Sequence, residues 1–161
     1  MEHLFTRTLA LTRTADVNAY IAGDVVGSAV AAGGAVLTFS SSGGAASPFS
    51  ITGSELRVDL TAVPATMTSF RLHLYNATPP SALGDNAAWD LPAGDTASYV
   101  GYVDLGTPVD VGSTLYVQAL NLNKAVRIAE NAPIYAYLQT IGAYTPASGT
   151  TMLIALHSIG Y

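Results

Sequence analysis

The chain has 161 residues, half of them hydrophobic, and it carries six Lys or Arg against eleven Asp or Glu, for a net charge of −5. This length suits one domain. The few cations are scattered along the chain, which excludes nucleic-acid binding through clustered phosphate contacts. The absence of cysteine excludes disulfides, zinc–thiolate sites and thiol catalysis.

Charged residues make up 11% of the chain, whereas a typical globular protein has about 25%. A folded monomer of 16.6 kDa exposes roughly 7,600 Å² of surface. So few charges on so large a surface predict a protein that covers much of itself with copies of itself or with a partner. The alternative is that a Thr-rich β-protein built from small residues has this composition without any such role.

The first predicted element is a strand over residues 6–14. Its residues alternate between two faces, with threonines and Ala10 on one face. The other face holds Arg7, Leu9, Leu11 and Arg13. The apolar runs around this strand are too short for a signal peptide or a membrane span, so neither is predicted.

Residues 1–14 have two interpretations, and both stay open. They are either an arm that pairs with an edge strand of a partner or a neighbouring copy, or the first strand of the domain that residues 15–161 form. As an arm, the segment is expected to make its contacts through Leu4, Phe5, Arg7, Leu9 and Leu11.

Further strands are predicted where short runs are rich in β-branched and aromatic residues. These runs are residues 55–60, 69–76, 97–105, 113–120, 134–140 and 151–160. Segments rich in Gly, Pro, Asn and Asp separate them, and no segment keeps a helical period through three turns. About eight short strands predict an all-β fold, a single antiparallel β-sandwich or jelly-roll-like domain.

Four aspartates gather in one stretch, at positions 85, 90, 95 and 104. A calcium loop needs acids at alternate positions, which this stretch lacks, and a catalytic carboxylate pair needs a cleft that the sequence does not show. We therefore predict that Asp85, Asp90 and Asp95 cap turns in an exposed loop that carries solvated charge. Asp104 is expected at the solvent end of a strand.

The remaining candidates for chemistry are one tryptophan and three histidines. Trp89 is expected either to plug the end of the sandwich or to anchor a partner, and it joins the predicted interface residues. His3, His73 and His157 lack metal-ligand spacing and are expected at the surface or at an interface. No nucleophile or phosphate-binding motif is present, so no catalytic residue, metal or cofactor is predicted, and the chain is not expected to be an enzyme.

Most of the nine tyrosines lie in the second half of the chain. Tyr135 and Tyr137 share one face of a predicted strand. Such a face either stacks on sugar rings, as in carbohydrate-binding modules, or packs across neighbouring strands.

Five stretches in a fixed order carry a resemblance to a known class of proteins. They are YIAGDVVG (20–27), FRLHLYNATPP (70–80), DNAAWDL (85–91), YVGYVDL (99–105) and residues 134–160. Together they resemble small β-rich proteins encoded in the structural modules of tailed bacteriophages, near the gene of the major capsid protein. The resemblance implies a capsid decoration (cement) protein without catalytic residues.

The resemblance also implies a location and partners. Such a protein is made in the cytoplasm of the bacterial host, sits as a homotrimer on the outer surface of the virion capsid, binds the major capsid protein and braces neighbouring capsomers. Neither nucleic acid nor a membrane is an expected partner. Two other functions stay open, namely a tail or head–tail connector component and a carbohydrate-binding adhesion module.

Overall fold

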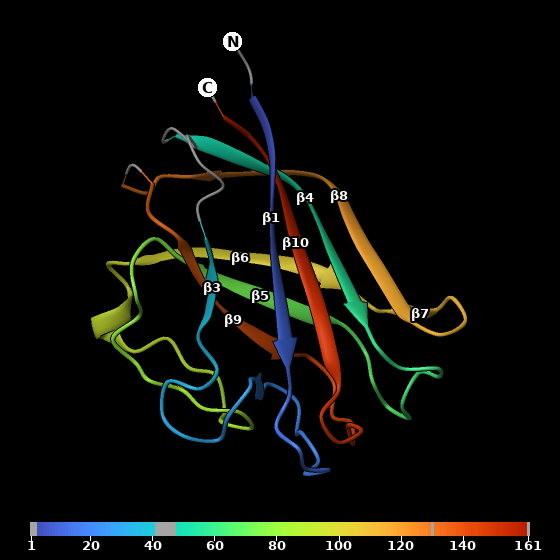
Figure 1. The fold of residues 1–161 in the computed structure, drawn as a ribbon. Coiled ribbons are helices and arrows are strands. Elements are labelled where there is room, and N and C mark those ends of the chain that lie inside the picture. Colours follow the sequence, from blue (N-terminus) through green and yellow to red (C-terminus); the bar gives the residue numbers. More distant parts are fainter. Residues whose placement is uncertain (1–2, 41–47, 130, 161) are drawn as a thin grey trace.

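The computed structural model describes residues 3–40, 48–129 and 131–160. Two antiparallel sheets pack face to face (Figure 1), which confirms the predicted all-β sandwich. Among the described residues the one helical element is the single 3-10 turn η1 (Ala93–Asp95), and no helix in this part of the chain could cross a membrane.

The first sheet has five strands. In spatial order they are β1 (His3–Thr12), β10 (Thr151–Gly160), β4 (Phe49–Val58), β8 (Leu115–Val126) and the two-residue β7 (Val109–Asp110). The second sheet begins with two short strands that share one edge of β9. Its strands are β2 (Val25–Val26), β3 (Leu37–Phe39), β9 (Ile134–Thr140), β5 (Phe70–Tyr75) and β6 (Tyr99–Gly106).

The connectivity is that of a jelly roll. Eight strands remain when β2 and β3 are counted as one interrupted strand and β7 as an extension beside β8. When these eight strands are numbered along the chain, their spatial order is 1-8-3-6 in the first sheet and 2-7-4-5 in the second. Two interlocked Greek keys of this kind define a jelly roll, so the predicted jelly-roll-like class is confirmed.

The core follows from the alternation along the strands. Phe70, Leu72 and Leu74 of β5 point between the sheets and are fully buried. Tyr75, which points to the opposite face of β5, is also buried, because the connection 76–98 folds back over the outer face of the second sheet. The second sheet is therefore covered on both faces.

The two ends of the sandwich differ (Figure 1). Both chain termini lie at one end, which we call the terminal end. At the opposite end lie the connections 13–24, 59–69 and 141–150, and we call this the loop end. Residues 3–12 form β1, which pairs with β10 along its whole length. The use of this segment as an arm toward another chain stays a prediction.

Candidate assembly surfaces

A buried ion pair holds the loop end together. The Arg13 side chain is wholly buried, and its Nη2 lies 3.3 Å from Asp85 Oδ2 and 3.2 Å from Asp16 Oδ1. Its Nε donates to the Tyr20 hydroxyl, and its Nη1 donates to the carbonyl of Ala147. Burial pulls the pKa of Arg13 down, but the hydrogen bond to Tyr20 and the charge of Asp85 leave that pKa raised. The guanidinium is therefore charged and fully engaged.

Asp85 completes this network from the other side. Its Oδ1 accepts from the Tyr20 hydroxyl at 2.6 Å and from the Gly27 N–H at 2.7 Å, and its Oδ2 accepts from the Thr14 hydroxyl at 2.7 Å. We call Arg13, Thr14, Tyr20, Gly27 and Asp85 the Asp85 clasp. It ties three separate loops into one rigid unit, which preorganises the loop end for contact.

The prediction of an exposed, solvated acidic loop is wrong for Asp85 and Asp95. Asp85 is 3% exposed and Asp95 is 1% exposed. Asp95 accepts hydrogen bonds from the backbone N–H and the hydroxyl of Ser81. Both residues do bind backbone N–H groups, as turn caps do, but inside the connection that covers the second sheet. Asp90 and Asp104 are exposed, and the prediction for Asp104 is confirmed.

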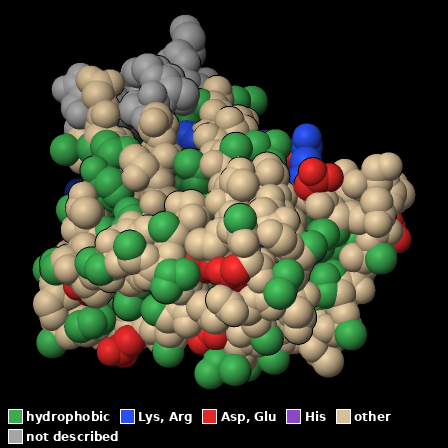
Figure 2. All heavy atoms as spheres, turned by 60° about the horizontal axis from the view of Figure 1, so that its bottom comes forward, with side chains coloured by type: hydrophobic (Ala, Val, Ile, Leu, Met, Phe, Trp, Pro, Cys, Tyr) green, Lys and Arg blue, Asp and Glu red, His purple; other side chains and the backbone are tan. Residues whose placement is uncertain are grey.

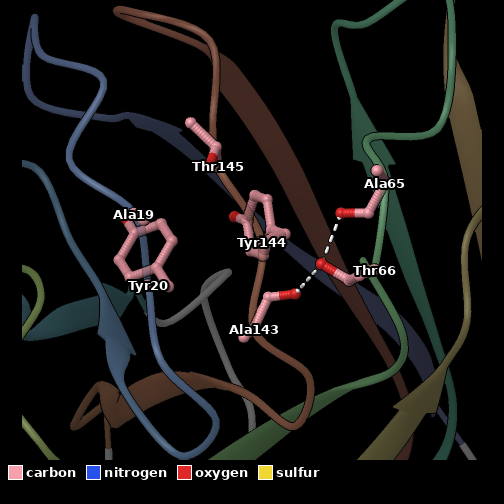
Figure 3. A pocket seen from close by; sticks show the side chains of 7 residues that line it. All are labelled: Ala19, Tyr20, Ala65, Thr66, Ala143, Tyr144 and Thr145. Carbon is pink, nitrogen blue, oxygen red and sulfur yellow. Dashed lines mark hydrogen bonds between the residues drawn. The ribbon is translucent and has the colours of Figure 1, made fainter.

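A hollow of about 260 Å³ opens at the loop end (Figure 3). Its lining consists of small, aromatic and hydroxyl side chains from three connections, namely Ala19, Tyr20, Ala65, Thr66, Ala143, Tyr144 and Thr145. Thr66 has φ 65°, a conformation that β-branched residues rarely adopt. Its hydroxyl bonds the carbonyls of Ala65 and Ala143 at 2.6 Å each, which holds this strained turn in place.

Exposed apolar side chains also lie in the connections of the loop end and beside them. The described residues expose ten large hydrophobic side chains, and five of them belong to loop-end connections or their neighbours, at 37% to 66% exposure. These five are Val17, Ile21, Val30, Val63 and Ile141. Figure 2 shows this end with hydrophobic side chains spread across it among a few acids, and no Lys or Arg appears in the lower half of the view. Polar side chains and backbone lie between these apolar groups, so the end combines exposed Val and Ile side chains with little charge.

None of these five residues is among those that the sequence predicts at an interface. Each lies in a segment that reads as turn or loop material, rich in Gly, Ala and Pro, and the sequence does not tell an exposed valine from one tucked under a loop. One residue in the sequence, Gly84, is related to the position of the Val30 loop. A Cβ there would lie 2.1 Å from the carbonyl oxygen of Val30, so the connection next to Asp85 needs glycine to approach the Val30 loop.

The edge of the first sheet is a second candidate surface. The predicted alternation of β1 is confirmed, because Thr6, Thr8, Ala10 and Thr12 are exposed while the residues between them face inward. Arg7 faces inward and is buried, with its guanidinium carbon 4.7 Å from the Phe5 ring centroid and 4.6 Å from that of Phe49.

Arg7 has an unusual environment for a buried cation. Its three guanidinium nitrogens are buried and have no hydrogen-bond partner in the part of the chain that the structure describes. Burial lowers the pKa of Arg7 from its usual value. The faces of the two phenylalanine rings are the nearest compensation for the charge.

Aromatic side chains fasten the connection 76–98 to the second sheet. The Trp89 ring stacks on His73, with the ring centroids 3.6 Å apart. His73 Nδ1 lies 3.0 Å from the Tyr99 hydroxyl, and its Nε2 lies 3.0 Å from Gln139 Oε1. Burial lowers the pKa of His73 to about 4, so the ring is neutral at pH 7.

Two predictions about these aromatic residues need correction. His73 was expected at the surface, but it is 2% exposed because Trp89 and its loop cover it. Trp89 does pack on its own chain, yet on the outer face of the second sheet and not at the end of the sandwich. His157 is half-exposed, as expected, and contacts Glu55, while the side chain of His3 lies outside the described part.

The tyrosines serve packing. Tyr137 is fully buried, and Tyr135, on the same face of β9, is half-buried beside the same connection. Tyr102 is exposed, and Arg71 lies 3.9 Å from its ring centroid. The two tyrosines of β9 therefore form no open platform for a sugar ring.

The six predicted interface residues have different environments. Leu4 is 81% exposed, whereas Arg7 and Leu11 are buried inside the sandwich. Phe5, Leu9 and Trp89 are half-buried. Leu4 thus offers its whole side chain to a partner, and the assignment of the six to an interface stays a prediction. Among the described residues, no three His, Asp or Glu side chains come together as a metal ion would need.

The chain has distant structural similarity to several solved structures. No family model and no curated protein matches it. A chain of the capsid of Ralstonia phage GP4 is similar, with 15% identity and a TM-score of 0.46 over 99% of this chain and 85% of that one. A chain of a nodavirus particle of the prawn Macrobrachium rosenbergii has 14% identity and a TM-score of 0.36, over 100% of this chain and 92% of its own.

A third similar chain comes from desmodium yellow mottle tymovirus, with 13% identity and a TM-score of 0.31 over 99% of this chain and 87% of that one. All three belong to viruses. At such low identities and scores the likeness does not extend to function, and the proposals below rest on the residues of this chain.

Proposed function

We propose that this chain is a structural virion protein of a tailed bacteriophage. In this proposal it is a capsid decoration (cement) protein, which binds the outer surface of a shell built from the major capsid protein and braces neighbouring capsomers. It associates with its own copies, as a homotrimer by the resemblance described above. It performs no catalysis and needs no cofactor.

The observation that carries the proposal is the poverty of surface charge. Among the described residues, five charged side chains are buried, namely Arg7, Arg13, Asp24, Asp85 and Asp95. At most twelve of the 17 charged residues are therefore left for a surface of 7311 Å². The centres of protein interfaces are depleted of charge, so a surface of this kind suits a protein that is largely covered by other proteins in an assembly.

The loop end is the best-defined contact surface. It combines exposed Val and Ile side chains, a hollow that can take an apolar side chain, and loops that the Asp85 clasp has already fixed. Because a rigid surface loses little conformational entropy on binding, more of the contact energy appears as affinity. We assign the loop end to the contact with the shell.

The test is co-sedimentation with shells assembled from the capsid protein of the same virus. The double variant Ile21→Asp with Val30→Asp places two charges on the loop end and is expected to weaken shell binding at least tenfold, since a desolvated charge is costly in an interface. The matched control is Val109→Asp with Val111→Asp, at similarly exposed positions in and after β7, and it should bind like the wild type.

Equal binding by both double variants would remove the loop end from the shell contact. A wild-type protein that stays in the supernatant would overturn the proposed function. A tail or head–tail connector component would use a similar surface, and images of particles separate it from a decoration protein by where the added density lies.

A further inference from the structure

The free edges of the two sheets are protected to different degrees. Natural proteins protect edge strands by keeping them short, by bulges or by outward charges. The pair β2 and β3 has strands of two and three residues. β7 covers only two residues of β8, and beyond β7 the strand β8 has a register shift against β4, positive φ at Asn121 and the charged Lys124. β6 has two register shifts against β5, positive φ at Gly101 and Gly106, and the exposed Asp104.

β1 has none of these protections. It is ten residues long, contains no proline, and pairs with β10 without a register shift from His3 to Thr12. Its exposed side chains are Leu4, Thr6, Thr8, Ala10 and Thr12, none of which is charged. A long, regular and uncharged edge of this kind is a template for another strand.

The register of β1 shows which backbone groups are free. The Arg13 N–H donates to the Thr150 carbonyl at 2.9 Å, directly after β1 ends. Because hydrogen-bonded pairs alternate along an antiparallel ladder, the odd-numbered residues of β1 bond β10. The even-numbered residues direct N–H and C=O to the open side. In the described part of the chain, no backbone group outside β10 bonds residues 4–12.

We propose that β1 pairs antiparallel with β1 of a second copy, across a two-fold axis at Thr8. The free backbone groups belong to even-numbered residues, so two copies can be centred on Arg7, Thr8 or Leu9. Centring on Arg7 places two buried cations opposite each other, which is strongly unfavourable. Centring on Leu9 shortens the overlap at the N-terminal side.

Centring on Thr8 keeps the two Arg7 side chains from facing each other directly and keeps a long overlap. The strands then overlap from Leu4 to Thr12, Arg7 faces Leu9 of the second copy, and Thr8 faces its own counterpart. Cross-strand threonine pairs are favourable. The exposed face of β1 carries no charge, so no like charges meet on that face, and the half-buried Leu9 gains cover at the edge.

The pair is a two-fold contact and is separate from any contact that forms a trimer. The strands run in opposite directions, so a pair carries one loop end at each extremity. This arrangement lets one pair touch two capsomers, a consequence that rests on the proposed function. The pairing itself does not depend on a shell.

The test uses the absence of cysteine, because a single introduced thiol can bond only with its counterpart in another copy. In Thr8→Cys the two Cα atoms lie about 5.5 Å apart in the proposed pair, within the disulfide range of roughly 4.4–6.8 Å. Thr12→Cys is the control on the same face of the same strand. Its two copies would lie roughly 26 Å apart.

Mild oxidation is expected to give at least tenfold more cross-linked dimer with Thr8→Cys than with Thr12→Cys. A mixture of Thr6→Cys and Ala10→Cys proteins should cross-link more than either protein alone, because these positions face each other across the axis. Equal cross-linking of Thr8→Cys and Thr12→Cys would overturn the pairing.

Light scattering gives an independent readout on the folded protein. Thr8→Lys sets two cations against each other at the axis and should lower the mass of the oligomer, whereas Thr12→Lys should keep the wild-type mass. An unchanged mass for Thr8→Lys contradicts the pairing. Neither experiment contains a shell, so a failed pairing leaves the proposed function standing, and a failed shell-binding experiment leaves the pairing standing.

Discussion

Arg7 and Arg13 occupy the same tripeptide, Thr-Arg-Thr, and both are buried, at 2% and 3% exposure. Arg13 has two carboxylates, a tyrosine hydroxyl and backbone carbonyls around it. Arg7 has two phenylalanine rings and, in the described part of the chain, no hydrogen-bond acceptor. Both arginines have a partner close in sequence, Asp16 for Arg13 and Phe5 for Arg7, but in the described part of the chain Arg13 alone also has a carboxylate from a distant loop, that of Asp85.

The two ends of the molecule differ in the same way. The loop end is complete within one chain, because the Asp85 clasp satisfies its buried charges. The other surface, on the first sheet, is incomplete within one chain. There the guanidinium N–H groups of Arg7 have no acceptor among the described residues, and β1 has an open edge. We interpret the loop end as a finished contact surface and the β1 edge as a surface that a second chain completes.

The largest effect is expected from breaking the clasp. Asp85→Ala leaves the Arg13 cation buried without its main counter-charge and removes the acceptor of three further groups. The free energy of unfolding should fall by about 3–5 kcal/mol, as for other broken buried pairs. Urea denaturation measures this.

The control for the clasp lies in the same acidic stretch. Asp90→Ala removes an exposed carboxylate and should change the free energy of unfolding by about 0.5 kcal/mol or less. If the two alanine variants lose similar stability, the clasp does not hold the loop end.

A smaller effect on stability is expected from acid pH, through the buried imidazole of His73. The pKa of His73 is lowered to about 4 in the folded protein, below the usual value of about 6.5, because the burial of the ring outweighs its hydrogen bond to Gln139. Protonation therefore favours the unfolded chain. The contribution of His73 to stability is complete above pH 6.5 and is lost as the pH falls toward 4.

The loss from His73 is on the order of 3 kcal/mol. Urea denaturation at several pH values measures it, with His73→Gln as the comparison, because this variant has no ring to protonate. The wild type should lose more stability than His73→Gln between pH 6.5 and pH 4. Parallel curves would show that His73 is not a buried neutral base.

The smallest effect is expected at Arg7. Arg7→Met removes a buried charge that has no hydrogen-bond acceptor among the described residues, and it puts a thioether between the two phenylalanine rings, a favourable contact. The free energy of unfolding should stay the same or rise by up to about 2 kcal/mol, whereas Arg13→Met should lower it. A large loss in Arg7→Met would show that the cation contributes more than the rings alone suggest.

Much of the fold could be predicted from the sequence, because alternation reports which face of a strand is buried. The strand pattern of β1 and β5 and the jelly-roll class follow from residues such as Leu9, Leu72 and Leu74. The short strands β2 and β3 could not be found, since they lie in Gly- and Ala-rich segments with little alternation. The start of β4 was also missed, although Phe49 and Ile51 alternate there with Ser50 and Thr52, and a register shift between Ile51 and Gly53 interrupts this part of the strand.

The contact surfaces could be predicted only in part. The poverty of charge is visible in the composition, and Leu4 is visible as an apolar residue ahead of a strand. The burial of Asp85, Asp95 and His73 depends on how the connection 76–98 returns over the second sheet, which no local pattern encodes. The same long-range packing decides that Ile21 and Val30 are exposed.

The central claim is that the protein belongs on the outer surface of a capsid. The most direct measurement is electron cryo-microscopy of shells, built from the capsid protein of the same virus, after incubation with the wild-type protein. The account predicts added density on the outer surface at the junctions between capsomers, with the loop end toward the shell. Bare shells at saturating protein, or density confined to the portal vertex, would contradict it.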